Sequence, residues 1–140
     1  MSKVNVEADF TASAADVWAK ISEFGGLDVW APGIEKCELE GKGVGAVRRI
    51  SMGGMEIAER MENLDDANRQ LSYSIVEGPM PVENYLATIS IFEGADGGAR
   101  LTWICDFDAP GMSDEQVAGM AAGMEGAYQG MIEGLQKHLG

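Results

Sequence analysis

The sequence predicts an α+β fold in which a seven-stranded curved antiparallel sheet combines with two short helices and a long C-terminal helix. A strand-like segment and two short helical segments come first, residues 34–107 then divide into six strand-like runs, and residues 113–139 have a helical period. An antiparallel sheet that carries one long amphipathic helix forms two layers. We expect a single domain over residues 1–140, because roughly 100–150 residues is the commonest domain size.

The N-terminal elements are predicted from alternation and capping. Residues 4–10 alternate apolar and polar side chains, as expected of a strand with one buried face. Ser13, with Asp16 three residues later, predicts the start of a helix. The glycine pair Gly25-Gly26 ends this helix, and Pro32-Gly33 ends a second short one.

Turn residues divide the middle of the chain into strands too closely spaced for parallel crossovers, which need about a dozen residues, so neighbouring strands must be antiparallel. The turns are Gly41-Lys42-Gly43, Gly53-Gly54, Asp65-Asp66-Ala67-Asn68, Gly78-Pro79-Met80-Pro81 and Gly94-Ala95-Asp96-Gly97-Gly98. The final helix is predicted to begin with a capping box at Ser113–Gln116. Its apolar stripe contains Val117, Met120, Ala121, Met124, Tyr128, Met131, Ile132, Leu135 and Leu139.

The hairpin around Gly53-Gly54 supplies the most specific functional prediction. A two-residue turn there pairs Met52 with Met55, Ile50 with Ile57, Arg48 with Glu59, and Ala46 with Met61. These residues share a mostly apolar face, which we expect to point toward the core. A buried guanidinium opposite a carboxylate either anchors a polar group of a ligand or is a structural ion pair, and both readings remain open.

Aromatic side chains on the neighbouring strands are candidate walls of the same interior. Alternation places Tyr73, Tyr85 and Trp103 on the inward faces of their strands. A buried tyrosine hydroxyl needs a hydrogen-bond partner, so it could orient a ligand or donate a proton, although such rings more often only fill a core.

The charge of the chain excludes several classes of partner. With 23 acidic and 10 basic residues the net charge is −13, which repels nucleic acid and anionic membrane surfaces. No run of about 18 apolar residues and no signal-peptide pattern occurs, so we expect no membrane insertion and a cytoplasmic location. Cys37 and Cys105 have no metal or disulfide spacing, and the only histidine is His138, so we expect no metal site.

Several short motifs, in this order of elements, resemble the START/Bet v 1-like (SRPBCC) superfamily, and most closely its polyketide cyclase/dehydrase and lipid-transport branch. The motifs are residues 30–33 (WAPG), 43–49 (GVGAVRR), 59–60 (ER) and 71–75 (LSYSI). The resemblance implies a helix-grip fold with a hydrophobic cavity under the C-terminal helix, commonly used without a metal or organic cofactor. It also implies that loops holding Trp30, Pro32, Met80 and Pro81 border the entrance to the cavity.

Together, the face assignments and the resemblance predict one set of ligand-binding residues. The set is Trp30, Pro32, Arg48, Ile50, Met52, Ile57, Glu59, Tyr73, Tyr85, Trp103, Met124 and Tyr128. Candidates for catalysis within it are Arg48, Glu59, Tyr73 and Tyr85.

Glycines on the final helix form a second stripe, predicted to lie roughly opposite the apolar one. They are Gly119, Gly123, Gly126, Gly130 and Gly134, and each exposed glycine costs a helix about 1 kcal/mol relative to alanine. The stripe indicates either a loosely held helix or a close contact with another backbone, such as that of a second copy in a homodimer.

Two functions of different classes remain open from the sequence. The first is a carrier or sensor that binds a hydrophobic or aromatic small molecule without changing it. The second is a cofactor-independent cyclase, aromatase or dehydratase in which Arg48 stabilises an oxyanion while Glu59 or a tyrosine moves protons. Fold alone does not choose between them.

Overall fold

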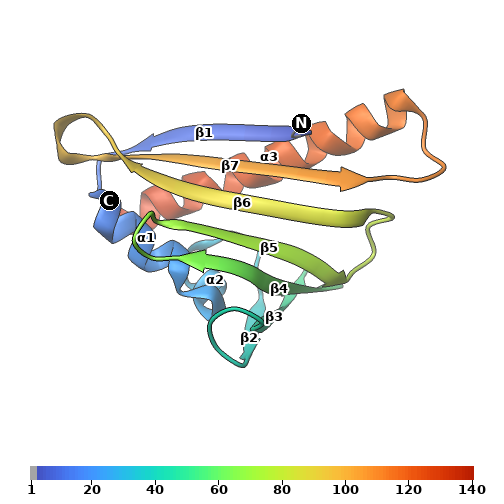
Figure 1. Ribbon diagram of the computed structural model, residues 1–140, viewed down its shortest axis with the longest axis horizontal. Coiled ribbons are helices and arrows are strands. Elements are labelled where there is room, and N and C mark those ends of the chain that lie inside the picture. Colours follow the sequence, from blue (N-terminus) through green and yellow to red (C-terminus); the bar gives the residue numbers. More distant parts are fainter. Residues whose placement is uncertain (1–2) are drawn as a thin grey trace.

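A computed structural model describes residues 3–140 and shows one antiparallel sheet in the order β1-β7-β6-β5-β4-β3-β2 (Figure 1). Each strand therefore pairs with its neighbour in the chain, except that β1 pairs with β7. The strands are β1 (Val4–Phe10), β2 (Lys36–Glu40), β3 (Val47–Met52), β4 (Met55–Asp65), β5 (Gln70–Glu77), β6 (Glu83–Glu93) and β7 (Ala99–Asp108). The predicted seven-stranded antiparallel sheet is confirmed, and its last six strands form the predicted meander.

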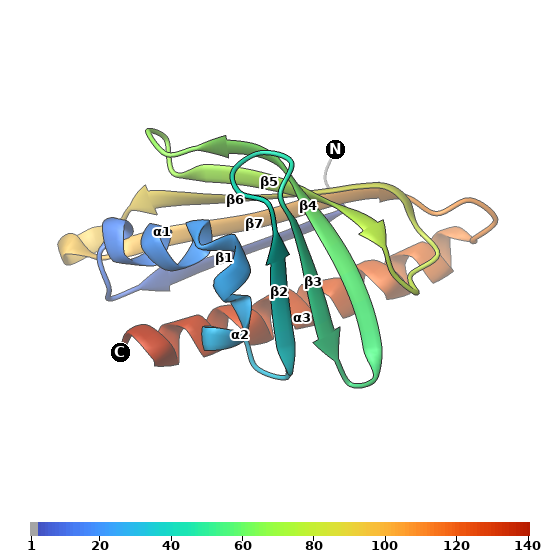
Figure 2. The same ribbon diagram turned by 90° about the horizontal axis from the view of Figure 1, so that it is seen from below.

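One long helix, α3 (Asp114–Leu139), runs beneath the sheet, and β2, β3 and β4 bend around it (Figure 2). The shorter helical elements are α1 (Ala14–Ser22), η1 (Phe24–Gly26), α2 (Leu27–Trp30) and η2 (Ala95–Gly97). The predicted α+β helix-grip arrangement is therefore confirmed. Within residues 3–140, no helix is long and apolar enough to span a membrane.

Side-chain caps define where α1 and α3 begin. The Ser13 hydroxyl accepts a hydrogen bond from the backbone N–H of Asp16 at 3.1 Å. At α3, the Ser113 hydroxyl accepts from the Gln116 N–H at 3.2 Å, and the Gln116 side chain accepts from the Ser113 N–H at 2.8 Å. These bonds satisfy N–H groups that have no partner inside the helix, so the predicted caps are present.

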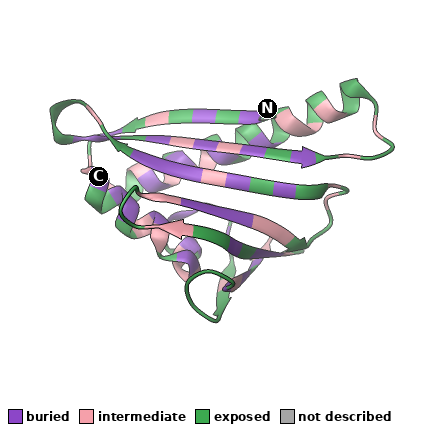
Figure 3. Cartoon of the chain, in the orientation of Figure 1, coloured by how far each residue is buried: buried purple, intermediate pink, exposed green. Residues whose placement is uncertain are grey.

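The core lies between the sheet and α3, and the strands alternate buried and exposed residues (Figure 3). On β6 and β7 every residue predicted to face inward is buried: Tyr85, Ala87, Ile89, Ile91, Leu101, Trp103, Cys105 and Phe107. Ala58 is a departure, because it lies on the predicted solvent face but is only 2% exposed. Its cross-strand partners Arg49 and Glu77 form an ion pair of 3.1 Å that bridges it.

Packing in the C-terminal half of α3 explains one of the helical glycines. A Cβ atom added to Gly134 would lie 2.6 Å from both the Trp30 carbonyl oxygen and the Pro32 Cδ. The glycine therefore lets the segment after α2 approach the helix backbone closely. Gly134 does not lie opposite the core, contrary to the prediction. A Cβ atom added to Gly119, Gly123, Gly126 or Gly130 would meet no neighbouring atom within 4 Å.

Candidate functional site

A small cavity lies between α3 and the inner face of strands β3 to β7. It has a volume of about 60 Å³ and is lined by Leu27, Ile34, Arg48, Ile50, Met52, Ile57, Glu59, Tyr73, Tyr85, Trp103, Tyr128 and Met131. Sites for drug-sized ligands occupy about 300–1,000 Å³. The chain's own side chains therefore fill most of the space under the helix.

The β3–β4 hairpin brings the two charged residues of the cavity together. Its register pairs Met52 with Met55, Ile50 with Ile57, and Arg48 with Glu59, as predicted from the Gly53-Gly54 turn. The Arg48 Nε donates a hydrogen bond of 2.8 Å to the Glu59 Oε1. Arg48 and Glu59 are 6% and 9% exposed, so this is a buried ion pair.

Phe24, in η1, completes the surroundings of the arginine. The Arg48 Nη1 donates to the Phe24 carbonyl oxygen at 3.3 Å, and the guanidinium carbon lies 4.0 Å from the Phe24 ring centroid. The Tyr73 ring is 5.0 Å from the same carbon, so two aromatic rings contact the cation. Sequence reasoning missed Phe24, because nothing in the local pattern around Gly25-Gly26 indicates a contact with β3.

Aromatic side chains form the deep wall of the cavity. The Trp103 Nε1 donates to the Tyr73 hydroxyl at 3.2 Å, and the hydroxyls of Tyr85 and Tyr128 are hydrogen-bonded to each other. The Tyr128 ring stacks on Trp103, with centroids 4.4 Å apart and planes 10° from parallel. Burial raises the pKa of all three tyrosines above the ordinary phenol value, so their hydroxyls stay protonated at neutral pH.

Most of the predicted ligand-binding residues line this cavity, but Trp30, Pro32 and Met124 do not. Trp30 is buried and Pro32 is exposed, and both lie beside Gly134. Met124 is buried with its sulfur 4.0 Å from the Cys105 sulfur.

The β5–β6 loop is also absent from the lining. Its predicted entrance residues differ in burial, with Met80 half-buried against the core and Pro81 exposed. Leu27, Ile34 and Met131 line the cavity instead. Met131 belongs to the predicted apolar stripe of α3, which is the signal that could have identified it.

Residues suited to metal binding do not gather in the described part of the chain. Among residues 3–140, no group of three or more His, Cys, Asp or Glu side chains is placed to hold an ion. Cys105 is buried on β7, Cys37 is half-buried on β2, and both are free thiols. His138 is exposed in the last turn of α3.

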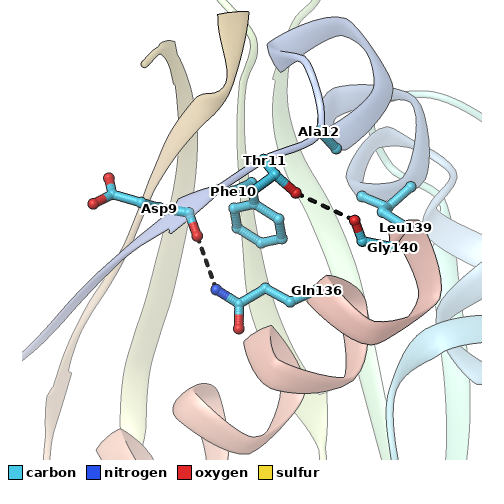
Figure 4. A pocket seen from close by; sticks show the side chains of 7 residues that line it. All are labelled: Asp9, Phe10, Thr11, Ala12, Gln136, Leu139 and Gly140. Carbon is cyan, nitrogen blue, oxygen red and sulfur yellow. Dashed lines mark hydrogen bonds between the residues drawn. The ribbon is translucent and has the colours of Figure 1, made fainter. Parts of the chain in front are cut away.

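Hollows also lie outside the cavity. A groove of about 570 Å³ runs between the η1–α2 segment and the β2–β3 loop, and Phe24 lies in its wall as well as against Arg48. A smaller pocket of about 190 Å³ lies between β1 and the end of α3 (Figure 4). There, Gln136 donates to the Asp9 carbonyl oxygen at 2.9 Å and Thr11 donates to the Gly140 carbonyl oxygen at 3.2 Å, while the Asp9 carboxylate points away.

Comparison with curated proteins finds two plant receptors. The chain is 27% identical to abscisic acid receptor PYL6 of Arabidopsis thaliana over 123 aligned residues. The alignment covers 79% of the chain and 57% of the receptor. It is 33% identical over 103 residues to abscisic acid receptor PYL2 of the same plant, covering 68% of the chain and 54% of the receptor. The chain thus spans little more than half the length of these relatives.

Solved bacterial structures match over nearly the whole chain. An uncharacterised protein of Bacillus thuringiensis has a TM-score of 0.85 at 30% identity, with 97% of both chains covered. The protein XoxI of Bacillus cereus has a TM-score of 0.85 at 30% identity, covering 97% of this chain and 94% of that one. The model of the family described as polyketide cyclase / dehydrase and lipid transport matches residues 1–140. The chain therefore belongs to this family, within the START/Bet v 1-like superfamily.

Proposed function

We propose that this protein binds a hydrophobic or aromatic small molecule in the cavity between the sheet and α3, as a carrier or sensor. The cavity itself carries this proposal, because it combines aromatic and aliphatic walls with one buried polar pair, Arg48 and Glu59. Binding sites for small molecules have this composition, with many apolar contacts and a few polar groups that fix orientation.

The small volume requires the cavity to enlarge when a ligand enters. Three of its lining residues, Met52, Ile57 and Met131, are only half-buried. Methionine side chains have three rotatable bonds and adapt readily to irregular spaces. We infer that the ligand enters where the β3–β4 hairpin meets α3, by displacing Met52 and Met131.

The two curated relatives support binding, because they are named as receptors for a small molecule, abscisic acid. The family's description names both polyketide cyclase / dehydrase and lipid transport, so it is compatible with binding and with chemistry. A receptor or carrier needs only a cavity and a way into it.

Binding is tested by titrating the purified protein with N-phenyl-1-naphthylamine, a neutral probe that fluoresces in apolar surroundings. Native mass spectrometry of the same preparation detects any molecule that co-purifies. Met131→Trp should abolish probe binding, because a larger ring fills the cavity. Met120→Trp is the matched control, since Met120 is a half-buried methionine of α3 that does not line the cavity. Equal binding by both variants would place the probe elsewhere and contradict the proposal.

An enzyme of the cyclase or dehydratase class is the second candidate, favoured by the convergence of Arg48, Glu59, Tyr73 and Tyr85 on one cavity. In that mechanism Arg48 would stabilise an oxyanion and Glu59 would act as a base. However, the Glu59 Oε1 already accepts from Arg48, and burial makes the tyrosines weaker acids. Turnover of a polyketide-like substrate that is lost in Glu59→Gln would favour the enzyme.

A further inference from the structure

The charges that line the cavity cancel. Arg48 is the only basic residue and Glu59 the only acidic residue among the lining side chains of the described chain. They are joined at 2.8 Å and are both buried, so the cavity as a whole has no net formal charge. The chain around it carries a net charge of −13, which opposes the approach of an anion.

The guanidinium of Arg48 is also already well compensated by protein groups. It donates to the Glu59 carboxylate and to the Phe24 carbonyl oxygen, and the rings of Phe24 and Tyr73 lie against it. A ligand carboxylate placed there would lose its hydration and would lie beside the Glu59 carboxylate. Burying a charge is unfavourable unless an unpaired opposite charge meets it.

The tyrosines do not supply that missing positive charge. Tyr85 and Tyr128 are hydrogen-bonded to each other, and the Tyr73 hydroxyl accepts from Trp103. These hydroxyls are neutral, so they can orient a polar group but cannot balance an anion.

The ion pair nevertheless keeps some hydrogen-bonding capacity. Within residues 3–140, the Nη2 of Arg48 and the Oε2 of Glu59 make no hydrogen bond to protein groups. The first can only donate and the second, when ionised, can only accept. A neutral group that both accepts and donates, such as a primary carboxamide or a lactam, matches this pair, whereas a carboxylate offers only acceptors.

We propose that the cavity selects neutral ring compounds whose polar group both donates and accepts a hydrogen bond, and that it discriminates against the corresponding carboxylates. This inference rests on the proposed ligand-binding function and narrows the class of ligand. The balance between Arg48 and Glu59 is its cause, so removing the negative partner should change the preference.

The test compares 1-naphthamide with 1-naphthoate, which share one ring system, by displacement of N-phenyl-1-naphthylamine at neutral pH. We expect the wild-type protein to bind the amide at least tenfold more tightly, which corresponds to about 1.4 kcal/mol. Glu59→Gln should shift the ratio by at least tenfold toward the carboxylate, because it leaves the charge of Arg48 unbalanced.

Glu56→Gln is the matched control, since Glu56 is an exposed carboxylate on β4 and does not line the cavity. It changes the net charge of the chain equally and should leave the ratio unchanged. Circular dichroism verifies that both variants fold. If Glu59→Gln does not fold, the ratio of the wild-type affinities for 1-naphthamide and 1-naphthoate decides alone.

Tight binding of 1-naphthoate by the wild-type protein, equal to that of the amide, would overturn the inference while leaving the binding function intact. An amide preference that Glu59→Gln does not alter would also overturn it. If N-phenyl-1-naphthylamine itself does not bind, the proposed function fails, and this inference fails with it.

Discussion

Arg48→Met should lower the free energy of unfolding by about 3–5 kcal/mol, because it leaves the Glu59 carboxylate buried without its partner. The two residues are 6% and 9% exposed and their nearest polar atoms are 2.8 Å apart. Two unit charges about 4 Å apart attract by about 4 kcal/mol at an effective dielectric constant of about 20, which is consistent with that range. Loss of the hydrogen bond to the Phe24 carbonyl oxygen adds about 1 kcal/mol.

Urea unfolding followed by tryptophan fluorescence measures this loss. Arg49→Met is the control, because Arg49 is the next residue on β3 but forms exposed ion pairs with Glu40 and Glu77, each at 3.1 Å. Exposed pairs of this kind contribute about 0–1 kcal/mol. The double variant Arg48→Met/Glu59→Met should recover most of the stability, since two apolar side chains replace the pair. Equal losses for Arg48→Met and Arg49→Met would refute the reasoning.

Two further predictions concern the tyrosines and the helical glycines. Burial raises the pKa of Tyr73, Tyr85 and Tyr128, so above about pH 10 the unfolded chain loses phenol protons that the folded chain keeps. The free energy of unfolding should therefore fall as the pH rises, by up to about 1.4 kcal/mol per pH unit for each tyrosine. Urea unfolding at several alkaline pH values measures this fall, and the phenolate absorbance of the folded protein is the second readout. Titration of the tyrosines near pH 10 in the folded protein would contradict the prediction. Gly134→Ala should destabilise the protein because its Cβ would meet the Trp30 carbonyl oxygen at 2.6 Å, whereas Gly123→Ala should stabilise it by about 0.5–1 kcal/mol. Thermal unfolding of both variants should give shifts of opposite sign, and two upward shifts would rule out the close contact.

The hairpin register could be predicted because its determinants are local. A two-residue turn at Gly53-Gly54 fixes which residues of β3 and β4 face each other, and this placed Arg48 opposite Glu59. The inward faces of β6 and β7 follow from alternation in the same way. In contrast, the contact of Phe24 with Arg48 joins residues 24 positions apart through η1, and no local pattern specifies it.

The glycine stripe shows how a helical pattern can mislead over a long distance. Gly134 comes fifteen residues after Gly119, so at 3.6 residues per turn it lies about 60° around the helix from Gly119. Gly134 has thus rotated toward the side where Trp30 and Pro32 approach. The volume of the cavity could not be predicted from the sequence either, because it depends on how the aromatic rings pack. These rings belong to Tyr73, Tyr85, Trp103 and Tyr128.

The strand order also has a consequence for self-association. Because β2 is paired only with β3, it is an edge strand, to which a strand of another chain could add. Lys36, Glu38 and Glu40 occupy every second position of β2 and are all exposed. Two copies meeting along this edge would bring together strands that each carry two carboxylates and one ammonium group, in chains with a charge of −13 each. The charges on β2 therefore disfavour strand addition at this edge of the sheet.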